Sequence, residues 1–229
     1  MKESLSQTQI IAIVWLVAIV IVGIWLLLRQ QRRRDLAMAG HGLGLSFSFR
    51  TDPELTAAIK SMQLFAYSHS ERAYHVLEGK FQGIDWRIGD YYYVTGTGKN
   101  SHGHGQTMAL CRTEPLLPDF TVSAERFYHR LAAMLGHTDI NFPAFPSFSR
   151  RYLLRAGNEA ALRRLFTPNI IRFFEQRNRT IHVAARSGWV AIYYPGRYIA
   201  GQDMRSFLEM AAELVQRLVR AQQAVQEEG

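Results

Sequence analysis

The polarity pattern of the chain is dominated by one apolar run, Ile10–Leu28, whose nineteen residues carry no charge. As a helix this run spans about 28 Å, close to the hydrocarbon thickness of a bilayer. A core helix of a globular protein would be unusual at this length with apolar residues on every face. The pattern therefore predicts a transmembrane helix at 10–28, preceded by a short tail at 1–9.

The flanks of the run distinguish a permanent anchor from a cleaved signal peptide. A signal peptide has a basic start, a shorter apolar core and a cleavage site of small residues. Here the charges of Lys2 and Glu3 cancel, so the start is not basic, and the run is followed by four arginines at 29–34. The sequence thus predicts an uncleaved single-pass anchor and a basic juxtamembrane linker at 29–50. Within this linker, residues 35–44 can continue the helix for a turn or two before Gly40, Gly42 and Gly44 end it. The arginines place the C-terminal side in the cytoplasm and the N-terminus outside.

The rest of the chain alternates between strand-like and helix-like patterns, which predicts an α+β fold. Residues 51–136 form a first α+β half. A helix is expected at 53–64, where Pro53 and Glu54 mark the first turn, and another at 124–135. The intervening segments read as strands of an antiparallel meander, with a further strand at 118–122. These strands are predicted at 73–78, 84–95 and 106–113.

A Pro-containing linker at 137–147 separates this half from a second one at 148–229. The second half is predicted to contain a strand, two short helices, a hairpin around Ser187-Gly188 and a long final helix. The strand is expected at 148–155 and the two short helices at 158–166 and 167–176. The strands of the hairpin are expected at 180–186 and 189–194, and the final helix at 203–226. The final helix has a broad apolar stripe, which either covers the sheet or pairs with a second copy. The predicted domain is thus a set of antiparallel β-hairpins covered by helices, and the shared plan leaves two similar halves open.

The chain is basic, with 27 Lys and Arg against 19 Asp and Glu. Clustered arginines favour an anionic partner, and near an anchor the nearest candidates are acidic lipid headgroups or an acidic membrane protein. An Arg-rich solvated surface without a partner is the alternative. The lone Cys111 excludes an internal disulfide and fits a reducing cytoplasm. The candidate anion-binding residues are Arg29, Arg32, Arg33, Arg34, Arg150, Arg151, Arg163 and Arg164.

A Gly-rich segment at 96–105 is predicted to be a hairpin loop. It contains Gly98-Lys99 but lacks the remaining residues of a phosphate-binding P-loop. His102 and His104 would point the same way on an extended segment and are candidate metal ligands. Further ligands would be needed, and no other His, Cys or Asp stands at a diagnostic spacing. Solvated loop histidines are the alternative.

No catalytic residue and no cofactor are predicted. Ser101 and His102 are sequence neighbours, which rarely reach the geometry of a nucleophile and its base. Asp85 and Asp90 lie on opposite faces of a strand and make a poor acid–base pair. Arginines interleaved with aromatic residues occur without a recognised nucleic-acid-binding motif, so nucleic acid is not an expected partner.

Several short segments within 70–215 resemble a family of bacterial membrane-anchored proteins that has no assigned activity. The resemblance implies a bacterial inner-membrane protein with one N-terminal anchor and a soluble domain, and it implies no catalytic residue. We therefore expect a tethered interaction or scaffolding module, or alternatively a tethered enzyme or metal protein that uses the 96–105 loop. The segments include Leu77-Glu78-Gly79, Asp90-Tyr91, Gln106-Thr107, Asp139-Ile140, Tyr152-x-Leu154 and Phe166-Thr167-Pro168.

Overall fold

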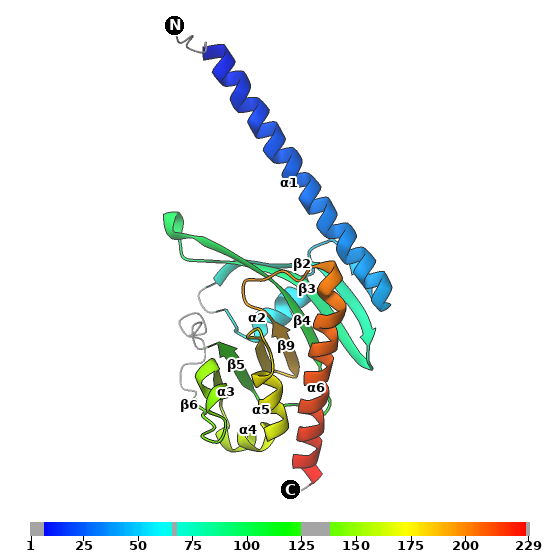
Figure 1. Cartoon of the computed structure of the whole chain (residues 1–229), viewed down its shortest axis with the longest axis vertical. Coiled ribbons are helices and arrows are strands. Elements are labelled where there is room, and N and C mark those ends of the chain that lie inside the picture. The colour runs from blue at the N-terminus through cyan, green and yellow to red at the C-terminus, as the bar shows by residue number, and fades with distance from the viewer. Residues whose placement is uncertain (1–6, 66–67, 125–137, 228–229) are drawn as a thin grey trace.

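The computed structural model describes residues 7–65, 68–124 and 138–227. A single long helix, α1 (Gln7–Leu43), projects from a domain built around one β-sheet (Figure 1). The predicted helix at 10–28 is confirmed as part of α1. Among the described residues, α1 is the one helix long and apolar enough to cross a membrane.

The second part of α1 belongs to the domain. Residues 29–43, which were assigned to the linker, are all helical, so the expected continuation of the helix toward Gly44 is present and the helix is unbroken from the apolar run onward. Their Arg, Gln, Leu and Ala residues favour helix, and burial fixes it in place. Leu36 is 1% exposed, and a Cβ on Gly40 would lie 2.6 Å from Leu77 Cδ2. The helix therefore packs closely on the sheet before it ends at Leu43.

The described residues form a nine-stranded sheet in the order β1-β2-β3-β4-β9-β8-β5-β7-β6. All neighbouring strands are antiparallel. The predicted α+β architecture of antiparallel strands and covering helices is thereby confirmed. The strands are β1 (Ser46–Ser48), β2 (Ser68–Phe81), β3 (Ile84–Thr95), β4 (His102–Arg112), β5 (Phe120–Ala124), β6 (Thr138–Asp139), β7 (Tyr152–Ala156), β8 (His182–Arg186) and β9 (Trp189–Tyr193).

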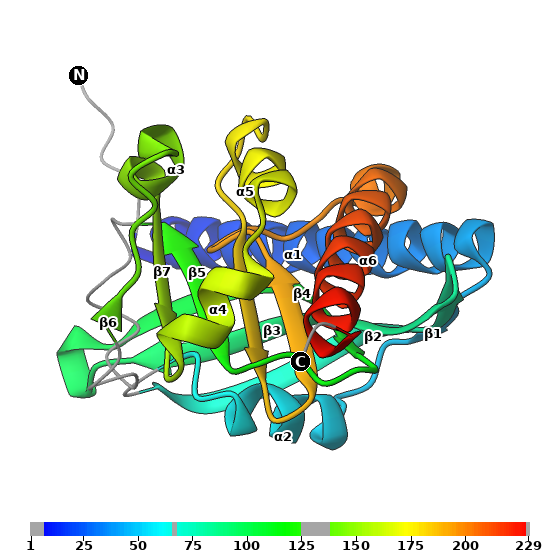
Figure 2. The same ribbon diagram turned by 90° about the horizontal axis from the view of Figure 1, so that it is seen from below.

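Helices lie on both faces of the sheet (Figure 2). The face beneath α3 to α6 carries the larger core, which also includes Leu36 of α1. The opposite face carries a smaller core in which Leu55 and Ile59 of α2 pack against the rings of Tyr91 and Tyr93. The helices are α2 (Pro53–Ser61), α3 (Pro146–Arg151), α4 (Glu159–Leu165), α5 (Pro168–Glu175) and α6 (Met204–Glu227).

The second half differs from the sequence prediction at its start. The strand predicted at 148–155 is present only from Tyr152, where β7 starts, and its first four residues belong instead to the helix α3, which Pro146 begins. Strand β5, from the first predicted half, lies between β8 and β7 of the second, so both halves share one sheet. The helix predicted at 124–135 falls outside the described residues except for Ala124, which ends β5.

Helix α6 uses its apolar stripe to cover the sheet. Met204, Phe207, Leu208 and Leu214 are all buried in the larger core. The stripe that the sequence offered for pairing with a second copy is therefore occupied within the chain. On the polar side, Arg217 Nη2 lies 2.6 Å from Glu213 Oε1.

Candidate functional site

A β-bulge in β2 creates the centre of the candidate site. Tyr74 pairs with Asp90 and Leu77 pairs with Ile88, so two residues of β2 face one residue of β3. His75, within the bulge, has a φ of 53°, which is unusual for a residue other than glycine. The bulge directs its ring inward, and His75 Nδ1 lies 3.1 Å from Asp90 Oδ2.

Asp90 is 2% exposed, and its carboxylate is held by several donors. Arg32 of α1 binds both oxygens, with Nη2 2.8 Å from Oδ1 and Nε 3.2 Å from Oδ2. Thr107 of β4 donates from Oγ1 to Asp90 Oδ1 at 2.7 Å. A buried carboxylate without such partners would be strongly unfavourable. Asp90 therefore joins α1, β2, β3 and β4 at one point.

The same cluster holds the segment that follows β9. The Thr107 hydroxyl accepts a hydrogen bond from the backbone N–H of Ile199 at 2.9 Å. Arg32 Nη1 donates to the carbonyl oxygen of Ile199. The segment carrying Tyr198 is thereby fixed beside α1, and the Arg32 guanidinium lies 5.7 Å from the centre of the Tyr198 ring.

A cavity of about 480 Å³ opens above this cluster, between α1 and the sheet. We call it the interface cavity. Helix α1 lines it with Trp25, Arg29 and Arg32, which lie where the apolar run gives way to polar residues. The domain lines it with Phe49, Thr51, Arg72, Tyr74, His75, Asp90 and Tyr198. The cavity thus lies at the level at which a spanning helix would leave the hydrocarbon and enter the headgroup layer.

Two tyrosines form one wall of the interface cavity. The hydroxyl oxygens of Tyr74 and Tyr198 are 3.1 Å apart. A Cβ at Gly105 would lie 1.9 Å from Tyr198 Oη, so a glycine in β4 is needed for this ring position. Desolvation, together with the hydrogen bond to Tyr74, raises the pKa of Tyr198. Its hydroxyl therefore stays protonated and able to donate at neutral pH.

The described residues that line the interface cavity include three guanidinium groups and one carboxylate. Asp90 neutralises Arg32, whereas Arg29 and Arg72 are exposed and rest on aromatic rings. The guanidinium of Arg29 lies 5.3 Å from the centre of the Trp25 ring, and that of Arg72 lies 4.9 Å from the Tyr92 ring. The cavity consequently has an excess of positive charge at its rim.

The eight predicted anion-binding arginines do not form one surface. Arg33 lies 4.9 Å from the centre of the ring of Phe49, which lines the interface cavity, and Arg34 is exposed and is not one of the lining residues. A second group lies on α3 and α4, at the far end of the domain from its junction with α1 (Figure 1). This second group consists of Arg150, Arg151, Arg163 and Arg164.

Two members of the second group have partners within the chain. Arg151 Nε donates to Thr180 Oγ1 at 3.2 Å, and Arg163 Nη2 lies 2.7 Å from Glu159 Oε1. Their charges are therefore partly committed to the fold.

The histidines of the predicted 96–105 loop lie on a strand. Residues 102–105 belong to β4 and pair with the end of β3, so the prediction of a loop over all ten residues is wrong. The pairing of β3 with β4 extends further than the glycines suggested. His102 is exposed, whereas His104 Nε2 lies 2.8 Å from Thr95 Oγ1 and its ring packs on Tyr93.

Metal binding at this position stays a prediction. Within residues 7–65, 68–124 and 138–227, no three His, Cys, Asp or Glu side chains come together as a metal site. Burial raises the pKa of the Cys111 thiol to about 12, which disfavours the thiolate that a metal would bind.

No pattern in the sequence predicted that Arg32, His75, Asp90 and Thr107 lie together. Arg32 and Asp90 are 58 positions apart, so no local spacing connects them. One signal was present, because Asp90 is an acid within a strand of otherwise mainly apolar and aromatic residues. A charge in such a strand requires a partner when it is buried.

The sequence matches no protein-family model, and no curated protein matches it. The fold is similar to that of a solved structure, the mycobacterial trehalose monomycolate transport factor A, TtfA. The TM-score is 0.55, and the match covers 82% of this chain and 93% of TtfA. The two chains share a fold at 9% sequence identity. The likeness therefore supports the architecture and carries no residue-level assignment.

Proposed function

We propose that the chain is a single-pass protein of a bacterial inner membrane, with its N-terminus outside and its domain in the cytoplasm, and a member of the anchored family that it resembles. The continuity of α1 supports an anchor over a cleaved signal sequence. Residues after the apolar run remain helical, and Arg32 and Leu36 are tied into the domain. The four arginines at 29–34 support the cytoplasmic orientation.

The proposed role is that of a non-enzymatic, membrane-tethered binding module whose interface cavity takes the anionic headgroup of a lipid. One observation carries the proposal. Arg29 and Arg72 flank a cavity at the membrane end of the domain, and no acidic side chain of the described residues forms an ion pair with either one. Their charge is thus available to a ligand.

The chemistry of the cavity suits a phosphate-bearing headgroup. Guanidinium groups bind phosphate oxygens in pairs of parallel hydrogen bonds. The hydroxyls of Tyr74 and Tyr198 supply further donors at the same wall. Trp25 provides an indole of the kind that favours the boundary between headgroups and hydrocarbon. The negative surface potential of the inner leaflet would concentrate such lipids around the arginines.

The fold likeness to TtfA gives the proposal modest support. TtfA is named for the transport of trehalose monomycolate, and its fold resembles that of this chain. A lipid-related role is in keeping with that likeness. The direct support comes from the interface cavity and its arginines.

Lipid retention tests the proposed function. The purified full chain, stripped of lipid in detergent, is titrated with phosphatidylglycerol and bound lipid is counted by native mass spectrometry. We expect retention to weaken about tenfold or more in Arg29→Gln/Arg72→Gln, because each lost phosphate contact removes a charge-assisted hydrogen bond. The matched control is Arg150→Gln/Arg164→Gln, which removes two exposed arginines far from the cavity.

Equal retention by the two double variants would contradict the proposal, as would equal retention of phosphatidylcholine. A reporter fused after Gly229 and active only in the cytoplasm tests the orientation separately. The alternative role, a tethered metal protein or enzyme using 96–105, predicts tight zinc binding that is lost in His102→Ala/His104→Ala.

A further inference from the structure

The side of the domain next to α1 carries a repeated pairing of arginines with aromatic rings. In four such pairs the guanidinium carbon lies between 4.9 and 5.7 Å from the centre of a ring. The pairs are Arg29 with Trp25, Arg32 with Tyr198, Arg33 with Phe49 and Arg72 with Tyr92. We call their domain residues, Phe49, Arg72, Tyr92 and Tyr198, the anchor-side face.

Two rings of the anchor-side face are exposed although they are large and apolar. Outside α1, the exposed side chains of this kind among the described residues are Phe49 at 53%, Tyr198 at 40% and Leu116 at 65%. Phe49 and Tyr198 line the interface cavity together with Trp25, which belongs to the apolar run. Both rings therefore lie close to the level at which that run would leave the hydrocarbon. An aromatic ring with a polar edge, such as that of Tyr198, favours this boundary.

The turn between β3 and β4, residues 96–101, extends the face with a cationic tip. Figure 1 shows this hairpin reaching out from the sheet on the side from which α1 projects. All six residues of the turn are exposed, and each is a glycine or a polar residue. The turn carries Lys99, and the chain has no acidic residue between Asp90 and Glu114. Such a turn is excluded from hydrocarbon, whereas its charge suits anionic headgroups.

Two glycines of β4 connect the turn to the anchor-side face. A Cβ on Gly103 would lie 2.5 Å from Tyr92 Oη, and a Cβ on Gly105 would lie 1.9 Å from Tyr198 Oη. Because neither glycine has a side chain, both tyrosine rings can lie directly against β4. The face and the turn are therefore parts of one continuous surface along the hairpin.

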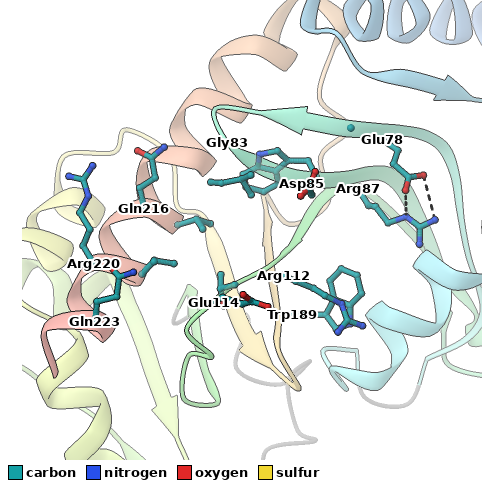
Figure 3. A pocket seen from close by; sticks show the side chains of 16 residues that line it. Glu78, Gly83, Asp85, Arg87, Arg112, Glu114, Trp189, Gln216, Arg220 and Gln223 are labelled. Atoms are coloured by element: carbon teal, nitrogen blue, oxygen red, sulfur yellow. Dashed lines mark hydrogen bonds and ion pairs between the residues drawn. The ribbon is translucent and has the colours of Figure 1, made fainter. Parts of the chain in front are cut away.

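The excess of positive charge is specific to this side of the domain. A second cavity, of about 900 Å³, lies beside α6 (Figure 3), and its lining contains Arg87, Arg112 and Arg220 together with Glu78, Asp85 and Glu114. Figure 3 shows Arg87 paired with Glu78, whose Oε1 lies 3.3 Å from Arg87 Nε. In contrast, Asp90 is the one carboxylate of the described residues that lines the interface cavity, and Arg32 neutralises it.

We propose that the anchor-side face and the β3–β4 turn dock on the headgroup layer of the anionic bilayer that α1 enters. The rings of Phe49 and Tyr198 lie at the boundary with the hydrocarbon, and Arg72 and Lys99 contact lipid phosphates. Because α1 is one unbroken helix with Leu36 buried against the sheet, the domain keeps one orientation to the bilayer. The inference rests on the proposed anchoring by α1, and it does not require a lipid inside the interface cavity.

Fluorescence quenching on the full chain in nanodiscs tests the docking. A dye is attached to a single cysteine in Thr51→Cys, Ser101→Cys or Gln223→Cys, all at exposed positions, while the buried Cys111 stays unlabelled. Thr51 lines the interface cavity, whereas Gln223 lies near the C-terminal end of α6, at the opposite end of the domain (Figure 1). The discs contain phosphatidylglycerol and a lipid with a nitroxide on its headgroup. We expect several-fold more quenching at positions 51 and 101 than at position 223.

A fourth label separates the docking from the anchoring. Val22→Cys lies within the apolar run, so a nitroxide on an acyl chain should quench a dye there if α1 crosses the bilayer. Quenching at position 22, with quenching at positions 51 and 101 no greater than at 223, would overturn the docking and leave the anchor in place. A second copy or another protein covering the face would give that result. No quenching at position 22 would overturn both proposals.

The charge of the turn is tested with the dye at position 101. We expect Lys99→Gln to lower quenching there, and phosphatidylcholine discs or high salt to lower it in the chain that keeps Lys99, because salt screens the attraction to anionic headgroups. The matched control is Lys80→Gln, which removes an exposed lysine from the part of β2 that pairs with the start of β3. Equal quenching in the two variants would show that the turn does not bind the headgroups, and would overturn the proposal.

Discussion

Arg32 and Asp90 form a two-point ion pair across 58 positions of sequence, with Nη2 2.8 Å from Oδ1 and Nε 3.2 Å from Oδ2. Arg32 belongs to the basic flank that follows the apolar run. Arginines at such a position ordinarily indicate which side of a membrane helix faces the cytoplasm. Here its side chain also holds α1 on the sheet. Helix α1 and the sheet are therefore coupled by a charge pair whose carboxylate is buried, and both partners of the pair line the interface cavity.

Removing Arg32 should destabilise the domain. In Arg32→Met the Asp90 carboxylate stays buried with fewer donors, and we expect a loss of about 3 kcal/mol in the free energy of unfolding. Combining it with Asp90→Asn should cost less than Arg32→Met alone, because no uncompensated charge remains. Thermal and denaturant unfolding in nanodiscs measure both. Arg34→Gln, at an exposed position, is the control and should change stability by about 0.5 kcal/mol or less.

Gly40 and Gly42 should respond in opposite directions to the same substitution. Gly40→Ala places a Cβ 2.6 Å from Leu77 Cδ2 and 3.1 Å from the carbonyl oxygen of Leu45, so the buried Leu77 side chain and the backbone at Leu45 must give way, or α1 must shift. We expect a loss of about 1–3 kcal/mol. Gly42→Ala meets nothing within 4 Å and should stabilise the helix by up to about 1 kcal/mol. Unfolding curves of the two variants that coincide would contradict the packing of α1 described above.

His182 should make stability depend on pH. Burial lowers its pKa to about 4, and its Nε2 accepts from the backbone N–H of Ala124 at 3.0 Å. As the pH falls below about 6.5, the His182 side chain becomes protonated in the unfolded chain but stays neutral in the folded chain. The free energy of unfolding therefore declines until the pH reaches about 4, where the folded chain also binds the proton. Between pH 7.5 and pH 5 this contribution amounts to about 2 kcal/mol.

The variant His182→Gln isolates this contribution. Its amide oxygen can accept from Ala124 but does not titrate over this range. Comparing the unfolding free energies of the two proteins at pH 7.5 and pH 5 should therefore give a smaller decline for the variant. An equal decline would assign the pH dependence to other groups.

Cys111 should be unreactive in the folded chain. Its thiol is buried, and desolvation raises its pKa to about 12, so almost no thiolate forms at pH 8. We expect a maleimide reagent to leave the native protein unlabelled and to label it fully in denaturant, as mass spectrometry would show. Rapid labelling of the native chain would mean that the β3–β4–β9 region of the sheet opens.

Much of the fold could be predicted from local pattern. The strand at 84–95 coincides with β3, and the hairpin around Ser187-Gly188 is present, because a φ of 53° followed by 78° suits that turn. Asn158 caps α4 by accepting from the N–H of Ala161, as its position before the helix indicates. Such features depend on a few neighbouring residues, so the sequence contains them directly.

Other features depended on contacts that the sequence does not display. The burial of residues 29–43 could not be predicted, because it comes from β1, β2, α6 and the turn at 201–203 rather than from their own pattern. His102 seemed part of a loop because its strand character comes from pairing with Thr95 across the hairpin. The arginines of α3 and α4 were grouped with those of α1 by type, whereas the fold places them at the other end of the domain (Figure 1).

The sequence by itself determined that the chain begins with a helix able to cross a membrane and continues as an α+β domain with a basic flank. Those properties follow from hydrophobicity, periodicity and charge, which are local or additive. Only the tertiary structure brought Arg32, His75, Asp90 and Thr107 together and opened a cavity beside them. A buried carboxylate is stable only when hydrogen-bond donors surround it in the folded structure. In this chain those donors come from segments that are far apart in the sequence, so no local pattern reveals them.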